Sequence, residues 1–115
     1  MSVLPQDSEA RKEIPMARGL LDYFPAALAE VSRVSLIGNE KHNPGEEMHH
    51  ARGKSMDHAD CIMRHLTERG CTDVVFANGR TYQVRHSAYL AWRALALLQQ
   101  EIEEDGLSTM PRGAK

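Results

Sequence analysis

The chain has 115 residues, a formal net charge of −2 and a pI near 6.3. This length fits a single domain with a modest core, and the charge argues against direct binding of DNA or RNA, for which a pI above about 9 is typical. Aromatic residues make up only 5 %, and the apolar residues are mostly Leu, Ala, Val, Ile and Met, which favours packed helices over a β-sandwich.

The cysteines and the N-terminal residues indicate a cytoplasmic protein. Cys61 and Cys71 do not form a CxxC pair, so both are expected to be free thiols in a reducing compartment. The first residues lack the basic flank and the apolar run of a secretory signal. No window approaches the roughly 20 apolar residues of a membrane span, so we expect no membrane association.

The first half of the chain is predicted to form an arm, a helix and a loop. Residues 1–15 are polar and contain two prolines, which predicts a flexible arm. Apolar residues recur every three or four positions from Pro25, which predicts a helix over 25–37 that Gly38 ends. Residues 38–54 have no such period and predict a long loop. Its charged residues and histidines favour a place beside a substrate.

A second helix and a hairpin are predicted next. Ser55 suits the N-cap of the helix and Gly70 its C-terminal end, with Asp57 in the first turn. Asn78-Gly79 between two β-rich runs then predicts a hairpin near 73–84. A lone hairpin is marginal in water, so we expect it to pack against helices or a second subunit.

The last predicted helix, over 86–104, has an apolar stripe wider than one neighbouring helix can cover. The predicted fold class is therefore mainly α: a small bundle of about three main helices with a short β-hairpin, completed by oligomerisation, most simply as a dimer. Residues 105–115 contain Pro111 and Gly113 and are predicted to be a flexible tail.

The densest chemistry lies in the second predicted helix. Asp57 and Asp60, three residues apart, would lie on one face and repel each other. Such a pair favours a divalent cation, since Mg²⁺ and Mn²⁺ take carboxylate oxygens. A solvated charged face is the alternative. The crowding of Arg64, His58 and His65 into the same segment argues for a site.

A phosphate-binding P-loop is not supported. Gly53-Lys54-Ser55 matches its end, but Met48 stands where the motif requires glycine, and no hydrophobic strand precedes it. Lys54 near a helix N-terminus still suits contact with an anion.

Four longer blocks carry a resemblance to a known family. They begin at Gly19 (GLLDYFPAALAEVSRV), Gly38 (GNEKHNPG), Ala51 (ARGKSMDHADCIMRHL) and Val84 (VRHSAYLAWRALALL). Together they resemble the phage and bacterial dATP/dGTP diphosphohydrolase N-terminal domain family, which is related to the MazG-like all-α nucleotide pyrophosphohydrolases. The resemblance covers about residues 16–102, and implies a single helical MazG-like domain over 16–104. For a phage-encoded chain, the compartment would be the bacterial host cytoplasm.

The resemblance implies hydrolysis of a deoxynucleoside triphosphate to a monophosphate and pyrophosphate, with Mg²⁺ or Mn²⁺ held by acidic residues on two helices. The MazG-like pattern is E-x-x-E on one helix and E-x-x-D on the next. Asp57 and Asp60 match the second pair. Glu30 matches one acid of the first pair, whereas Ala27 and Arg33 occupy the positions three before and three after it.

The departure leaves three candidate metal ligands where the pattern offers four, with Glu40, Glu47 or His65 as candidates for the fourth. In this hypothesis Arg64 and His65 are catalytic, the first on the phosphates and the second as a proton carrier. The residues expected to bind substrate are Lys41, Lys54, His58 and His86.

Two other functions remain open at this stage. One is a His/Asp metal phosphohydrolase with His58, His65, His86 and Asp60 as ligands, although the sequence has no adjacent His-Asp pair. The other is a non-catalytic helical protein that binds nucleotides or partners and keeps the family fold.

Overall fold

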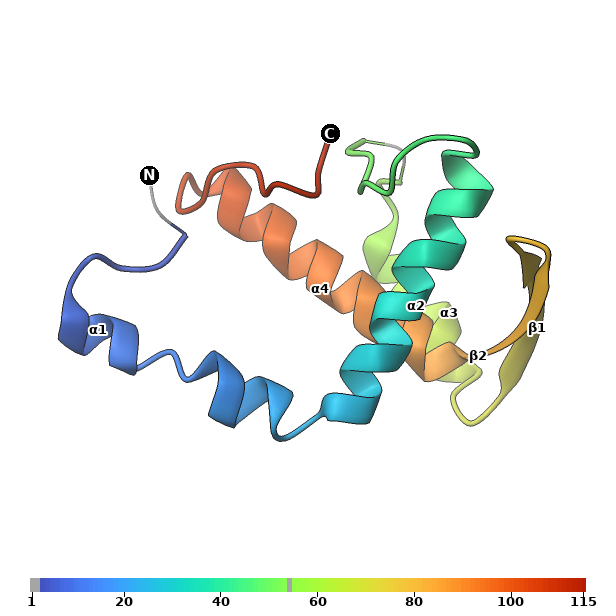
Figure 1. The fold of residues 1–115 in the computed structure, drawn as a ribbon, viewed down its shortest axis with the longest axis horizontal. Helices are drawn as coiled ribbons and strands as arrows, with labels where there is room; N and C mark the ends of the chain where they lie inside the picture. Colours follow the sequence, from blue (N-terminus) through green and yellow to red (C-terminus); the bar gives the residue numbers. More distant parts are fainter. Residues whose placement is uncertain (1–2, 54) are drawn as a thin grey trace.

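The computed structural model describes residues 3–53 and 55–115 (Figure 1). The described residues form four α-helices, one π-helical turn and one antiparallel hairpin, which confirms a mainly α fold with a hairpin. In chain order the elements are α1 (Ser8–Lys12), η1 (Ala17–Leu21), α2 (Pro25–His42), α3 (His58–Thr67), β1 (Thr72–Ala77), β2 (Arg80–Arg85) and α4 (His86–Glu104). None of the described helices combines the length and apolar character that crossing a membrane requires.

Helix α2 is longer than the sequence predicted. It begins at Pro25 as expected but continues through Gly38 to His42, so the predicted loop over 38–54 is wrong for its first five residues. A hydrogen-bonded end explains the extension. The Asn43 backbone N–H donates to the Asn39 carbonyl at 2.7 Å, and the Asn43 side-chain Nδ2 donates to Asn39 Oδ1 at 3.1 Å. These bonds satisfy the last helical turn, which the missing side chain of Gly38 does not interrupt.

Helix α3 is shorter than predicted. Its N-cap is Asp57 rather than Ser55, and its last residue is Thr67, so Asp57 precedes the first helical turn. Ser55 is not a cap because its hydroxyl donates to Asp57 Oδ1 at 2.8 Å. Gly70 lies beyond the helix in a left-handed conformation, with φ at 87°, where a residue without Cβ is favoured.

The predicted hairpin is confirmed, with β1 and β2 paired in register from Thr72 opposite Arg85 to Ala77 opposite Arg80. Asn78 and Gly79 both have positive φ, 53° and 71°, as a two-residue hairpin turn with the right twist requires. The hairpin does not stand alone, because Val84, 1 % exposed, joins its inner face to the helices.

The buried core is small and lies where the hairpin meets two helices. Val34 and Ile37 come from α2, Ala77 and Val84 from the hairpin, and Ala88 from α4. Four partly buried side chains pack around it: Val75, Tyr82, Tyr89 and Trp92.

The two terminal segments differ in how they are held. The predicted arm contains α1, and with η1 it leads away from the start of α2, on the side opposite the hairpin (Figure 1). The tail predicted over 105–115 instead pairs with the loop after α2. Ala114 forms a parallel bridge with His50, and the Arg52 N–H donates to the Lys115 carbonyl at 2.7 Å.

The chain is more open than its length requires. Its radius of gyration is 15.6 Å, whereas a compact domain of this length has about 13 Å. Its accessible surface is 8457 Å², whereas a monomer of this mass exposes about 6,300 Å². Much apolar side-chain area therefore lies at the surface, including Leu95 and Leu98 of α4, which are 53 % and 54 % exposed.

Candidate anion-binding cavity

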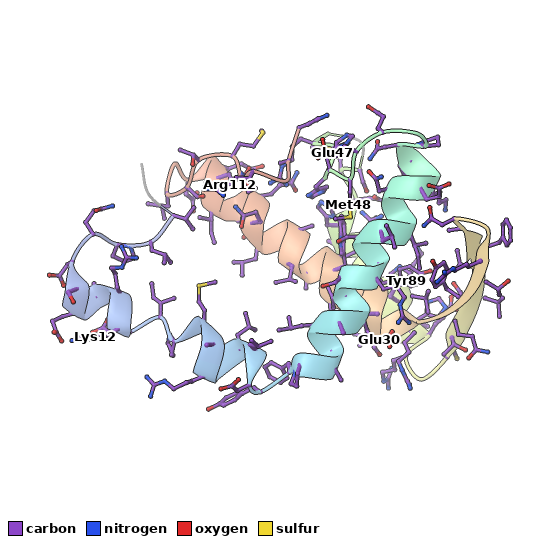
Figure 2. The ribbon with its side chains drawn as sticks, in the orientation of Figure 1. Lys12, Glu30, Glu47, Met48, Tyr89 and Arg112 are labelled. Carbon is purple, nitrogen blue, oxygen red and sulfur yellow. The ribbon has the colours of Figure 1, made fainter. Side chains whose placement is uncertain are left out.

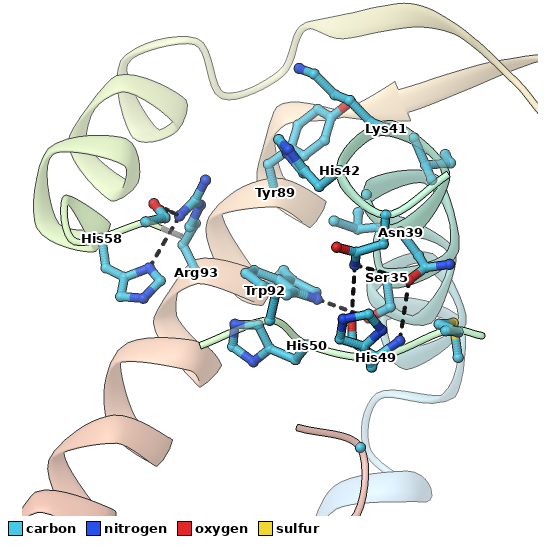
Figure 3. A pocket seen from close by; sticks show the side chains of 18 of the residues that line it. Ser35, Asn39, Lys41, His42, His49, His50, His58, Tyr89, Trp92 and Arg93 are labelled. Carbon is cyan, nitrogen blue, oxygen red and sulfur yellow. Dashed lines mark hydrogen bonds between the residues drawn. The ribbon is translucent and has the colours of Figure 1, made fainter. Parts of the chain in front are cut away.

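A cavity of about 800 Å³ lies between the C-terminal half of α2, the loop that follows it, α3 and α4 (Figure 3). Its size falls in the range of small-molecule sites. The cationic or titratable basic residues that line it are Lys41, His42, His49, His50, Arg52, His58, His65 and Arg93. Among the described lining residues Lys41, Arg52 and Arg93 are cationic and Asp73 is the one carboxylate, so the excess of cationic groups favours an anion.

Aromatic rings form one wall of the cavity. Trp92 and Tyr89 project from neighbouring turns of α4, and His50 meets Trp92 edge-on with ring centroids 4.9 Å apart (Figure 3). The Arg93 guanidinium lies 5.7 Å from the Trp92 ring centroid. Aromatic rings and a positive charge therefore lie side by side, an arrangement that suits a ligand with both a planar ring and a phosphate group.

Arg93 connects α4 to the start of α3. Its Nη1 donates to Ser55 Oγ at 2.6 Å and to His58 Nδ1 at 3.2 Å. Because His58 accepts at Nδ1, its own hydrogen is on Nε2. Burial lowers the pKa of His58, and the Arg93 charge lowers it further. His58 is therefore held neutral and oriented at the cavity wall.

The loop after α2 is held by amide groups. Asn39 Oδ1 accepts from the His49 backbone N–H at 3.2 Å, and Asn43 Nδ2 donates to the His49 carbonyl at 3.3 Å. Further along the loop, Arg52 Nη2 donates to Glu103 Oε2 at 2.7 Å, and both side chains are largely buried. Burial lowers the pKa of His50, with Arg52 as the next cause. The loop is thus attached to α2 at one end and to α4 at the other.

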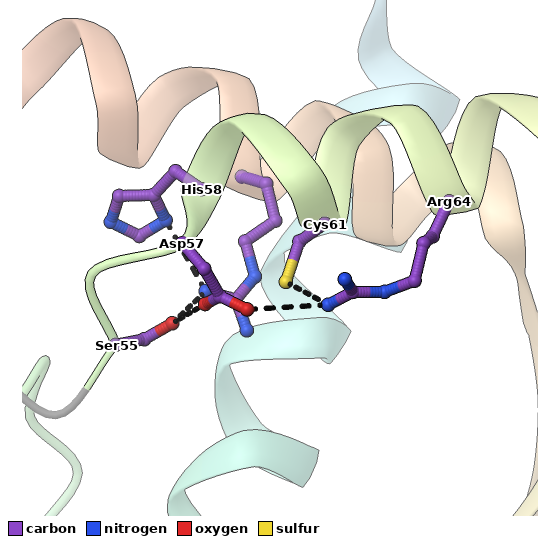
Figure 4. A network of polar contacts seen from close by, with 6 residues as sticks. Ser55, Asp57, His58, Cys61 and Arg64 are labelled. Atoms are coloured by element: carbon purple, nitrogen blue, oxygen red, sulfur yellow. Dashed lines mark hydrogen bonds and ion pairs between the residues drawn. The ribbon is translucent and has the colours of Figure 1, made fainter.

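Asp57 and Arg64 belong to a polar network at the start of α3, which Ser55 joins to Arg93 (Figure 4). Arg64 Nη2 donates to Asp57 Oδ2 at 3.3 Å and to Cys61 Sγ at 2.9 Å. The Ser55 hydroxyl and then Arg64 lower the pKa of Asp57 to about 2. Asp57 in turn raises the pKa of Arg64. Both side chains are more than half exposed, and neither lines the cavity.

His65 and His86 meet at the opposite end of α3. Their Nδ1 atoms are 2.9 Å apart, and His86 Nε2 lies 3.0 Å from Asp73 Oδ1 and 3.3 Å from Glu68 Oε2. His86 is buried behind the cavity wall, whereas His65 lines the cavity and stacks on Tyr89 with ring centroids 4.9 Å apart.

The structure places only some of the predicted catalytic and substrate-binding residues at the cavity. Lys41, His58 and His65 line the cavity, His86 supports His65 from behind, and Arg64 lies outside. Lys54, also predicted to bind substrate, lies outside the described residues.

The predicted metal ligands are not gathered at one point. Glu30 lies in α2, where its Oε1 is 3.9 Å from Arg33 Nη1. Asp57 is paired with Arg64, and Asp60 is exposed on α3. In residues 3–53 and 55–115 no three His, Cys, Asp or Glu side chains are grouped to hold a metal ion. The Mg²⁺ or Mn²⁺ site therefore stays a prediction.

The alternative His/Asp set is brought together in part. His65 and His86 do meet, but His58 is bound to Arg93, and the carboxylate on His86 is Asp73 rather than Asp60.

Several cavity residues were not singled out by the sequence. Asp73 belongs to a hairpin strand and shares no local pattern with the histidines. Trp92 and Arg93 lie within an apolar helical stripe, where the expected role is packing. The one available signal was the clustering of histidines around the loop, since three of the cavity histidines, His42, His49 and His50, lie close together in sequence.

No family model, curated protein or solved structure matches the chain in these comparisons. The class that the fold and cavity define is thus a mainly helical protein with a cationic, aromatic-walled cavity.

Proposed function

We propose that the chain is a nucleoside triphosphate pyrophosphohydrolase of the cytoplasm, which converts dATP or dGTP to the monophosphate and pyrophosphate. The observation that carries this proposal is the cavity of about 800 Å³, with eight basic residues and one carboxylate among its described lining residues. The resemblance of the sequence to the dATP/dGTP diphosphohydrolase N-terminal domain family supports the choice of reaction and substrate.

The cavity suits both parts of a nucleotide. Arg93 and Lys41 present cationic groups, and such groups bind phosphate oxygens. Trp92 presents a ring on which a purine can stack, beside the stacked pair of Tyr89 and His65. A purine deoxynucleotide therefore meets its phosphates and its base within one space.

The expected Mg²⁺ or Mn²⁺ would supply charge neutralisation of the triphosphate. Asp57, Asp60 and Glu30 have the oxygen donors that these ions prefer, and one or two carboxylates plus substrate phosphates suffice for Mg²⁺. Their present arrangement does not fit a shared ion, because Asp57 is bound by Ser55 and Arg64.

A nucleotide-binding protein without catalysis is the second candidate. It is favoured by the ion pairs that engage Asp57 and Glu30, since a paired carboxylate must lose its partner before it binds a cation. Both candidates bind the nucleotide in the same cavity, and only the first hydrolyses it.

The test combines binding with turnover. We expect dGTP to quench the fluorescence of Trp92, the one tryptophan of the chain, and Arg93→Gln to weaken dGTP binding at least tenfold, whereas Arg80→Gln on the exposed hairpin turn leaves it unchanged. Chromatography of dNTPs incubated with Mn²⁺ then detects hydrolysis. Binding without any hydrolysed product would favour the second candidate, and absence of binding would exclude both.

Asp60→Asn tests the metal prediction, because this change keeps the side-chain volume and removes a ligand charge. We expect loss of Mn²⁺-dependent hydrolysis with an unchanged melting temperature. Asp105→Asn, at the C-cap of α4, is the matched control and should keep full activity. Full activity of a folded Asp60→Asn protein would place the cation elsewhere.

We also propose that the fold is completed by a second copy of the chain. An apolar groove of about 330 Å³ lies between η1, the first half of α2 and the outer face of α4. Figure 2 shows the described side chains around these elements in the view of Figure 1. The groove is lined by Leu20, Phe24, Ala27, Leu28, Val31, Ala91, Ala94, Leu95 and Leu98. The accessible surface exceeds that of a compact monomer by about 2,000 Å², enough for an obligate interface.

A further inference from the structure

Two histidines and a carboxylate form a continuous chain of contacts that ends in the cavity. Asp73 of β1 contacts Nε2 of His86, the first residue of α4, at 3.0 Å. The Nδ1 of His86 contacts the Nδ1 of His65, in the last part of α3, at 2.9 Å. His65 lines the cavity, whereas His86 is 6 % exposed and buried behind it.

The hydrogen positions follow from the partners. A carboxylate only accepts, so His86 Nε2 carries a hydrogen and donates it to Asp73, with Glu68 as a second acceptor at 3.3 Å. A neutral His86 then has a bare Nδ1, which accepts from His65 Nδ1. A neutral His65 that donates from Nδ1 has a lone pair on Nε2, the ring nitrogen left for a molecule in the cavity.

His65 is held neutral and in a fixed plane. Burial is the largest cause that lowers its pKa, and the nearby guanidinium groups of Arg93 and Arg64 act in the same direction, against an opposing effect of Asp73. Its ring stacks on Tyr89 at an interplanar angle of 23°. Burial raises the pKa of Tyr89, so this neighbour remains a neutral phenol.

We propose that Asp73, His86 and His65 form a proton relay for hydrolysis of the triphosphate, an inference that rests on the proposed function. His65 is the catalytic residue, and His86 and Asp73 are positioning residues. His65 Nε2 takes a proton from a water molecule as the water oxygen bonds to phosphorus. The hydrogen on His65 Nδ1 passes to His86 Nδ1, which creates an imidazolium stabilised by the Asp73 and Glu68 carboxylates.

The products balance. The new P–O bond replaces the anhydride bond between the α- and β-phosphorus atoms, so monophosphate and pyrophosphate separate. The pyrophosphate leaves as an anion, and the proton held by the histidine pair then passes by the reverse path, through His65 Nε2, to water in the cavity. Both histidines and Asp73 end in their starting state, and no oxidant or reductant is needed.

The first test reads the relay in the free protein. Long-range proton–nitrogen NMR near pH 8 is expected to show His65 with its hydrogen on Nδ1, the less common tautomer, and His86 with its hydrogen on Nε2. A hydrogen on His65 Nε2 would overturn the relay. This measurement needs no substrate and is independent of the proposed function.

The second test separates turnover from binding. Asp73→Asn keeps an acceptor for His86 Nε2 but removes the charge that stabilises the imidazolium. Its side chain is half exposed, so we expect the fold to persist. The expected result is a fall in kcat of about 100-fold, with KM and dGTP affinity within about threefold. Asp105→Asn is the charge-matched control and should keep the wild-type kcat.

The outcomes distinguish the relay from the function on which it rests. Because Glu68 is a second carboxylate beside His86 Nε2, the deciding variant is Asp73→Asn combined with Glu68→Gln. Equal kcat for this double variant and Asp105→Asn, with hydrolysis intact, overturns the relay alone. Absence of hydrolysis by the wild-type chain overturns the proposed function and the catalytic role of His65 together, and the NMR tautomers then show whether the hydrogen-bond chain exists.

Discussion

Trp92 Nε1 donates a hydrogen bond to Ser35 Oγ at 2.8 Å, and this bond joins α4 to α2 at the base of the cavity. Both residues line the cavity, and Trp92 also contacts His50 and Arg93. The same bond therefore fixes the separation of two helices and the plane of the ring on which a base is proposed to stack.

Ser35→Ala is expected to lower the free energy of unfolding by about 0.5–1.5 kcal/mol, the usual net value of one hydrogen bond. Release of the indole should also shift the Trp92 emission to longer wavelength and weaken dGTP binding. Urea unfolding followed by fluorescence measures the first effect. Ser32→Ala is the control, because it removes an exposed hydroxyl that donates to the Leu28 carbonyl of the same helix. Equal stability of the two variants would show that the Trp92 bond contributes no more than this exposed bond.

Glu103→Ala should destabilise the protein more than Glu104→Ala. Glu103 accepts from Arg52 at 2.7 Å with both side chains largely buried, whereas Glu104 is exposed. Removal of one partner leaves a charge unpaired, which costs about 2 kcal/mol and corresponds to a fall in melting temperature of about 8 °C in a domain of this size. Calorimetry on the two variants gives the comparison, and equal melting temperatures would refute it.

Folding stability should decrease as the pH falls below 6.5. The pKa values of His50, His58 and His65 are all lowered in the folded chain, chiefly by burial. Below pH 6.5 these histidines take up protons in the unfolded chain more readily than in the folded chain. Folding stability is therefore greatest above pH 6.5 and is lost as the pH falls through the lowered pKa values of the folded state. Thermal melting from pH 8 to 5 follows the loss.

Affinity for a polyanion should instead rise as the pH falls, because bound phosphates favour the protonated form of nearby histidines. His58→Asn keeps an acceptor for Arg93 and removes one titrating group. It is expected to flatten both pH profiles, measured by melting and by Trp92 fluorescence with dGTP. An unchanged pH dependence would mean that His58 does not titrate in this range.

Leu98→Glu should convert a dimer to a monomer. Leu98 lines the apolar groove and is 54 % exposed in the single chain, so a carboxylate there would be buried at the proposed interface. Light scattering is expected to give twice 12.9 kDa for the wild type and 12.9 kDa for the variant. Leu107→Glu, exposed outside the groove, should remain dimeric. A wild-type mass of 12.9 kDa at tens of micromolar would exclude the dimer.

The sequence predicted those elements whose signals are local. The Asn78-Gly79 turn and the start of α4 at His86 were correct, because turn chemistry and helical period act over a few residues. The predicted end of α2 was wrong, because Gly38 was interpreted as a stop, whereas hydrogen bonds of the Asn39 and Asn43 amides, to each other and to the loop that follows, sustain the helix.

The cavity was predictable only in part for the same reason. His58 and His65 were selected from a dense segment, and both line the cavity. Asp73 was not selected, because it lies 13 residues before His86 in the sequence and only the fold of the hairpin brings the two side chains together. The i,i+3 spacing of Asp57 and Asp60 predicted a shared helical face, but the N-cap position of Asp57 turns its carboxylate toward Ser55 and Arg64.

The bridge between His50 and Ala114 has a practical consequence for how the protein is produced. The Lys115 N–H donates to the His50 carbonyl at 3.1 Å, and Gly113 lines the cavity. An affinity tag fused after Lys115 would therefore emerge beside the cavity wall and could alter its shape, and a hexahistidine tag would add imidazoles next to a cavity already lined with them. Purification through an N-terminal tag, removed by a protease before assay, keeps the measured binding that of the chain itself.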